Sequence, residues 1–133
     1  MEAKLRCVML VDDNPDDNYF HQRVIGKYDR SLKVISMESA NEAMAFLKSN
    51  PHRENHPDLI FLDVNIPGMN GWEFLDAFNN LDAELRNKSV VVLLTTSDDQ
   101  QISSREKPRK FLADFQSKPL TVNILQDLKA KYF

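Results

Sequence analysis

The chain of 133 residues is poor in cysteine and glycine and contains no long apolar run. Its single cysteine, Cys7, excludes an internal disulfide framework and suits a reducing cytosol. With only three glycines, 42% hydrophobic residues and 28% charged residues, the composition is that of a globular chain and excludes disorder. No apolar stretch approaches the length of a membrane span, and the polar start "MEAKLR" is not a signal sequence. We therefore expect a soluble, cytoplasmic protein.

The formal net charge of −3 gives no reason to expect a general binder of nucleic acid or of anionic membranes. The length fits one domain with one core. Since the sequence also shows no internal repeat, low-complexity segment or linker, we expect a single domain over residues 1–133.

Apolar runs of strand length recur along the chain. They are "CVMLV" (7–11), "LKVISM" (32–37), "LIFL" (59–62), "VVVLL" (90–94) and the weaker "FLADF" (111–115). The first, third and fourth runs are nearly continuous in apolar residues, which is typical of parallel strands covered by helices on both faces.

Segments with helical spacing lie between these runs. The first begins after Asn14 as the cap, with Pro15 at the first helical position and an expected apolar side of Phe20, Val24 and Tyr28. The other expected helices are marked by Ser39 and Glu42 as a capping box, by Phe74 to Phe78, by Ser97 as a fourth start, and by Ile124 to Leu128. Five β-α repeats predict an α/β fold, a three-layer sandwich around a parallel sheet.

Polar residues follow the expected strands where each strand ends. Asp12 and Asp13 follow the first strand, Asp63 the third, Thr95 the fourth, and Lys118 the fifth. The carboxyl ends of parallel strands lie at one edge of the sheet, where ligands bind in such folds. We therefore expect three carboxylates, a hydroxyl and an ammonium to converge there.

Carboxylates that crowd together repel one another and need a compensating charge. Oxygen ligands favour a hard cation, and Mg²⁺ is commonly held by one or two carboxylates together with water and phosphate oxygens. A carboxylate such as Asp63, held in line with a phosphoryl group, can act as a nucleophile and form an acyl phosphate. In that chemistry Lys118 supplies a second positive charge, and Thr95 donates a hydrogen bond to a phosphoryl oxygen.

Four separated motifs resemble the receiver domains of bacterial two-component response regulators. They are "VMLVDDNPDD", "PDLIFLDVNIPGMNGWEFL", "VVVLLTTS" and "FQSKPL", and they span the chain in the family's order. The resemblance implies a flavodoxin-like (βα)5 fold with a five-stranded parallel sheet in the order 2-1-3-4-5. Since the chain stops after the fifth helix, we expect a stand-alone receiver without an output domain.

The resemblance also implies roles for the acidic residues. Asp63 resembles the phosphoacceptor, and Asp12 and Asp13 resemble the acidic pair that holds Mg²⁺ beside it. Asn65, two residues after the acceptor, is expected to offer its backbone carbonyl to the metal.

A second group of residues resembles the switch of the family. Thr95 matches the switch hydroxyl, Phe115 the switch aromatic, and Lys118 the phosphate-binding lysine, with a cis peptide bond before Pro119. Thr96 is bulkier than the small residue usual after the switch threonine, so we expect it to narrow access to the site. The 97–111 segment departs most from the family's pattern.

The function that follows is phosphoryl acceptance from a sensor histidine kinase or a histidine phosphotransfer protein onto Asp63, in a Mg²⁺-dependent reaction. The phosphorylated protein would then control a partner through the face made by the fourth helix, the fifth strand and the fifth helix. Such a domain catalyses only its own phosphorylation and dephosphorylation, and a relay role is the alternative.

Other classes fit less well. A haloacid dehalogenase phosphatase needs a second aspartate where this chain has Asn65, and a flavin or nucleotide carrier needs a phosphate-cradling loop where it has "VDDNPDDN". A receiver-like interaction module without phosphoryl turnover remains the third alternative. The histidines show no metal-ligand spacing and are expected to be solvated; they are His21, His52 and His56.

Overall fold

The computed structural model describes residues 5–49, 56–63, 71–81, 89–95 and 112–133. In these parts five strands form one sheet in the order β2-β1-β3-β4-β5, and all neighbours are parallel. The strands are β1 (Cys7–Val11), β2 (Lys33–Met37), β3 (Leu59–Asp63), β4 (Val90–Thr95) and β5 (Leu112–Ser117). The predicted fold and strand order are confirmed.

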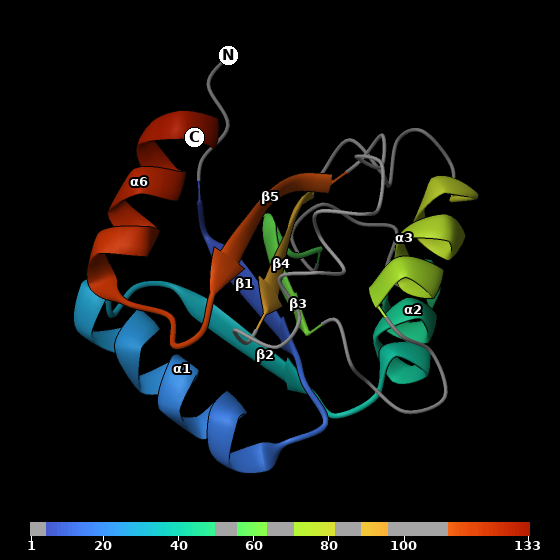
Figure 1. Cartoon of the computed structure of the whole chain (residues 1–133), viewed down its shortest axis with the longest axis horizontal. Helices are drawn as coiled ribbons and strands as arrows, with labels where there is room; N and C mark the ends of the chain where they lie inside the picture. The colour runs from blue at the N-terminus through green and yellow to red at the C-terminus, as the bar shows by residue number, and fades with distance from the viewer. Residues whose placement is uncertain (1–4, 50–55, 64–70, 82–88, 96–111) are drawn as a thin grey trace.

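The helices cover both faces of the sheet (Figure 1). They are α1 (Pro15–Tyr28), α2 (Ala40–Ser49), α3 (Gly71–Asn79) and α6 (Val122–Tyr132). α1 and α6 lie on one face, and α2 and α3 lie on the other (Figure 1). The fourth helix expected from Ser97, and the rest of the 97–111 segment, fall outside the described residues.

The central strands form where the sequence is most continuously apolar. Every residue of β1 and β3 is buried, because alternate side chains of each strand enter the two cores on either face of the sheet. Met9 and Ile60 pack with α2 and α3, whereas Val8 and Leu59 pack with α1 and α6. Asp12 thus follows a fully buried strand, and Asp63 ends another.

The predicted cap of α1 and the Ser39 half of the predicted capping box of α2 are present. The side-chain oxygen of Asn14 accepts hydrogen bonds from the backbone N–H groups of Asp16 and Asp17, with Pro15 at the first helical position. At α2 the hydroxyl of Ser39 accepts from the backbone N–H of Glu42 at 3.3 Å. These caps fix where α1 and α2 leave the sheet edge.

The predicted inner side of α1 is confirmed for Val24 and Tyr28, which are partly buried against the core, and was wrong for Phe20. The buried residues of α1 are Asn18, His21 and Ile25, while Phe20 is 49% exposed. Apolar spacing did not predict the burial of the two polar residues, Asn18 and His21. The side-chain amide of Asn18 donates hydrogen bonds to the backbone carbonyls of Asp12 and Met37. The ring of His21 makes an edge contact with the ring of Phe20.

The expectation of solvated histidines was also wrong for two of the three. His21 and His56 are each 2% exposed, and His52 lies outside the described residues. His56, just before β3, has its Nδ1 atom 3.2 Å from the hydroxyl oxygen of Ser89. That hydroxyl also donates to the carbonyl of Pro57 at 2.6 Å, so a polar contact accommodates this buried ring.

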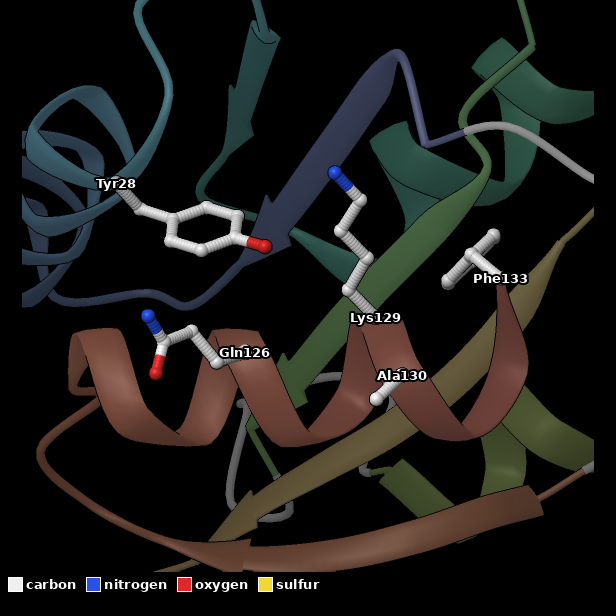
Figure 2. A pocket seen from close by; sticks show the side chains of 5 residues that line it. All are labelled: Tyr28, Gln126, Lys129, Ala130 and Phe133. Atoms are coloured by element: carbon white, nitrogen blue, oxygen red, sulfur yellow. The ribbon is translucent and has the colours of Figure 1, made fainter.

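In the described parts of the chain, no helix is long and apolar enough to span a membrane. A shallow pocket lies between the last turns of α1 and α6 (Figure 2). Its lining side chains are Tyr28, Gln126, Lys129, Ala130 and Phe133. Tyr28 ends α1, so this pocket lies at the opposite end of that helix from the strand-end acids.

Candidate phosphoryl and metal site

Three carboxylates gather at the carboxyl edge of the sheet. One oxygen from each of Asp12, Asp13 and Asp63 lies within 4.8 Å of the others. Asp12 and Asp63 are buried, at 4% and 8% exposed, whereas Asp13 is open to solvent. The convergence predicted from the ends of the first and third strands is therefore present.

Lys118, which follows β5, reaches across the edge to these acids. Its Nζ atom lies 2.7 Å from Oδ2 of Asp12 and 3.5 Å from Oδ2 of Asp63. The same ammonium donates a third interaction, to Oδ2 of Asp17 on α1 at 3.1 Å. The peptide bond between Lys118 and Pro119 is cis, as the resemblance implies.

The charges around Lys118 decide its protonation. Burial by itself would lower the pKa of this ammonium. The hydrogen bond that the ammonium donates to Asp12 and the charge of Asp12 act in the opposite direction, supported by the charge of Asp63 and the hydrogen bond donated to Asp17. Together they outweigh burial and raise the pKa of Lys118 above its ordinary value. These carboxylates therefore favour the protonated form of Lys118.

Backbone hydrogen bonds hold the first of these acids in place. The backbone N–H of Asp12 donates to the carbonyl of Met37 at 3.0 Å, which extends the pairing between β1 and β2. The carboxylate of Asp12 accepts from the backbone N–H of Asn14 at 3.0 Å. The side-chain amide of Asn18 donates to the carbonyl of Asp12 at 2.9 Å. Turning the Asp12 side chain away from the site would therefore break its hydrogen bond with the backbone N–H of Asn14, the cap of α1.

The remaining predicted site residues are placed only in part. Thr95 ends β4 opposite Ser117, and Phe115 lies on β5 opposite Leu93; these positions concern the backbone. Asn65 and Thr96 fall outside the described residues. The roles predicted for these four residues stay predictions.

Sequence reasoning missed Asp17 and Asn18. Both lie at the start of α1, in the stretch "VDDNPDDN", one contacting Lys118 and the other the carbonyl of Asp12. The cap could have indicated them: Asn14 and Pro15 start α1 directly after Asp12 and Asp13, so the first turn of the helix lies at the same edge of the sheet. The strand pattern by itself indicates only the acids that directly follow the strands.

The donor set suits a hard divalent cation. The cluster of Asp12, Asp13 and Asp63 offers oxygen ligands only, and three converging negative charges favour Mg²⁺ over softer metals. The three residues are therefore suitable ligands for Mg²⁺.

The comparisons with known proteins agree with this geometry. A two-component response regulator from Cytophaga hutchinsonii has a similar structure, with a TM-score of 0.82 and 32% identity over 97% of each chain. Response regulator Rcp1 from Synechocystis is 33% identical over 104 residues, which cover 76% of this chain and 70% of that protein. Sporulation initiation phosphotransferase F from Bacillus subtilis is 30% identical over 117 residues, 88% of either chain.

Residues 8–128 match the response regulator receiver domain family. The chain belongs to this family, and the resemblance seen in the four motifs is confirmed. Its role is that of a phosphoacceptor in two-component signalling.

Proposed function

We propose that Asp63 is the phosphoacceptor of this receiver domain. The observation that carries the proposal is the position of its carboxylate, which shares a cluster with Asp12 and Asp13 and lies 3.5 Å from the ammonium of Lys118. No other arrangement in the described parts of the chain combines a strand-end carboxylate, two further acids and a partly buried cation. A nucleophile held in this way needs no reorganisation to meet a phosphoryl group.

In the proposed reaction an oxygen of Asp63 attacks the phosphorus of a phosphohistidine. The new P–O bond forms as the P–N bond breaks, and the electron pair returns to the imidazole nitrogen of the donor. Hydrolysis reverses the modification when water attacks phosphorus and the carboxylate leaves. Lys118 offsets the charge of the phosphoryl oxygens in both steps. The domain thereby catalyses only the phosphorylation and dephosphorylation of its own Asp63.

Mg²⁺ would be held by Asp12, Asp13 and Asp63, with the backbone carbonyl of Asn65 as a further ligand. When bound, the ion supplies charge compensation and gathers phosphoryl oxygens beside the acceptor.

The phosphoryl donor we propose is a sensor histidine kinase or a histidine phosphotransfer protein. The alternative is a relay, in which the phosphoryl group passes from Asp63 to a second histidine. The similarity to sporulation initiation phosphotransferase F supports this alternative. Thr95 and Phe115 would signal phosphorylation to a partner protein, and Thr96 would narrow access to the acceptor. These assignments rest on the match to the family's motifs.

The direct test is phosphorylation by a small donor such as acetyl phosphate in the presence of Mg²⁺. We expect an acid-stable, base-labile phosphate that peptide mass spectrometry places on Asp63. Asp63→Asn should abolish incorporation while retaining the fold, and Asp16→Asn should retain incorporation because Asp16 is an exposed residue of the α1 cap. A phosphate mapped to another residue of the wild type would overturn the assignment. A wild type that takes up no phosphate would instead favour an interaction module without turnover.

A further inference from the structure

Lys118 has three carboxylate partners, and one of them stands apart from the proposed metal cluster. Asp12 and Asp63 belong to that cluster, whereas Asp17 does not. From this geometry we infer that Asp17 is a positioning residue, which retains Lys118 at the acceptor when a divalent cation occupies the acids. The inference deepens the proposed function and rests on it.

The position of Asp17 is fixed by the start of α1. Asn14 caps the helix by accepting from the backbone N–H groups of Asp16 at 2.9 Å and Asp17 at 3.4 Å. Because the first turn is anchored in this way, the carboxylate of Asp17 meets the ammonium of Lys118 without a search through many conformations. Asp16 is exposed beside it, which provides a matched position for comparison.

Lys118 lies between a buried acid and a partly exposed one. The side chain of Asp12 is 5% exposed and that of Asp17 is 40% exposed, while that of Lys118 itself is 13% exposed. The ammonium thus bridges the interior of the site and its solvent edge. An ammonium has three N–H groups, so it can satisfy partners on both sides at once.

A bound divalent cation and Lys118 would share the carboxylates of Asp12 and Asp63. Oδ2 of Asp12 lies 2.7 Å from Nζ of Lys118 and belongs to a residue of the proposed metal cluster. Two cations sharing one carboxylate repel each other, so metal binding drives the ammonium away from Asp12. Asp17 is the partner that the metal does not take, and it holds the displaced ammonium within reach of Asp63.

Loss of Asp17 therefore acts unequally on the two states of the site. Without metal, Lys118 still has Asp12 and Asp63 as partners. With metal, both of those acids are shared with a divalent cation, and the ammonium has lost its separate anchor. The substitution therefore destabilises the metal-bound state more than the metal-free state. Mg²⁺ should bind Asp17→Asn about fivefold more weakly than it binds the wild type.

The experiment is calorimetric titration of Mg²⁺ into the full chain, without any phosphodonor. Asp16→Asn is the control, because it removes the same charge one residue earlier on the same exposed turn. We expect little change for Asp16→Asn, a clear loss for Asp17→Asn, and recovery for Asp17→Glu. In a Lys118→Met background, Asp17→Asn and Asp16→Asn should have equal effects, because the ammonium that Asp17 positions is gone.

The possible results distinguish a failure of the positioning role from a failure of the proposed metal site. If the wild type binds Mg²⁺ and Asp17→Asn binds it as tightly as Asp16→Asn does, the positioning role is wrong and the metal site stands. If Asp17→Asn loses the same affinity with and without Lys118, Asp17 acts directly on the metal, and the role is again wrong. A wild type that binds no Mg²⁺ overturns the metal assignment and this inference together. Should Lys118→Met fail to fold, Lys118→Gln provides the second background, because it also removes the ammonium while keeping a polar side chain at this position.

Discussion

The side-chain amide of Asn18 donates a 2.9 Å hydrogen bond to the backbone carbonyl of Asp12, inside the fold. The same nitrogen lies 3.4 Å from the carbonyl of Met37 at the end of β2. One buried side chain of α1 therefore joins the ends of two neighbouring strands at the edge that carries the acids.

This relationship predicts that Asn18→Ala destabilises the protein. Removing the amide leaves the carbonyl of Asp12 without a buried donor, and the free energy of unfolding should fall by about 1–3 kcal/mol. Urea denaturation measures it. Gln22→Ala removes an exposed amide from the same helix and should change the free energy by less than about 0.5 kcal/mol. Equal stabilities for the two variants would contradict the bridging role.

The proposed metal site predicts opposite effects of one substitution on metal binding and on metal-free stability. Asp13→Asn removes an exposed ligand, so the Mg²⁺ affinity should fall by about tenfold or more. Without metal, the free energy of unfolding should stay constant or rise, because one of three like charges is gone. Calorimetry and metal-free urea unfolding provide the two measurements. Equal Mg²⁺ affinity in Asp13→Asn and the wild type would show that the metal assignment is wrong.

The switch proposed for Phe115 predicts a shallow equilibrium. A phenylalanine ring has no hydroxyl to keep solvated, so turning it inward costs less desolvation than turning a tyrosine. We expect the inward state to be populated before phosphorylation and to become more populated afterwards. Side-chain NMR of Phe115, with and without a beryllofluoride phosphate mimic, follows the populations. A ring wholly outward before activation and wholly inward after it would refute the shallow switch.

Buried His21 predicts a loss of stability in mild acid. Burial lowers the pKa of its imidazole below the ordinary value of 6.5, and the nearby ammonium of Lys118 adds to the effect. The unfolded chain therefore binds the proton more readily, and the free energy of unfolding should fall as the pH drops below about 6.5. Urea denaturation at several pH values should show a smaller slope for His21→Gln than for the wild type.

Gln22→His is the control for that measurement. It adds an exposed imidazole to the same helix, whose protonation is nearly the same in the folded and unfolded chains, so the pH slope should match that of the wild type. An unchanged slope in His21→Gln would assign the acid sensitivity to other groups.

Gly26 predicts a simple stabilisation of α1. It lies within the helix, and a Cβ atom added there would meet no atom of the described residues within 4 Å. Gly26→Ala should therefore raise the free energy of unfolding by about 0.5–1 kcal/mol, because alanine loses less backbone entropy in a helix. Thermal unfolding measures the gain, and Mg²⁺ affinity should not change. A destabilised variant would reveal a constraint at this position.

The strands were predictable because their sequences leave few choices. The runs that became β1 and β3 are apolar throughout, as strands covered on both faces must be, and their predicted bounds differ by at most one residue. β5 extends to Ser117, two residues beyond its predicted end. Its polar residues Gln116 and Ser117 belong to the strand because they pair with Leu94 and Thr95 of β4. Pairing of that kind depends on the neighbouring strand and leaves no apolar pattern.

The site was predictable to the extent that it follows strand ends. Asp12, Asp13, Asp63 and Lys118 are brought together because parallel strands end at a common edge. Asp17 was missed because its contact depends on how α1 leaves that edge, which a strand pattern does not encode. The burial of Asn18 was missed for a related reason, because one of its hydrogen-bond acceptors, the carbonyl of Met37, lies at the end of β2.

β1 and β3 are hydrogen-bonded neighbours without an exposed residue, and each is followed or ended by a buried acid. Asp12 and Asp63 cannot spread apart unless the sheet itself opens, so folding alone keeps these like charges crowded. An ion that relieves the crowding binds the folded chain and not the unfolded one, and its concentration then enters the folding equilibrium. The melting temperature of such a chain rises with the logarithm of free magnesium, and the persistence of the folded state follows the ionic composition of its surroundings.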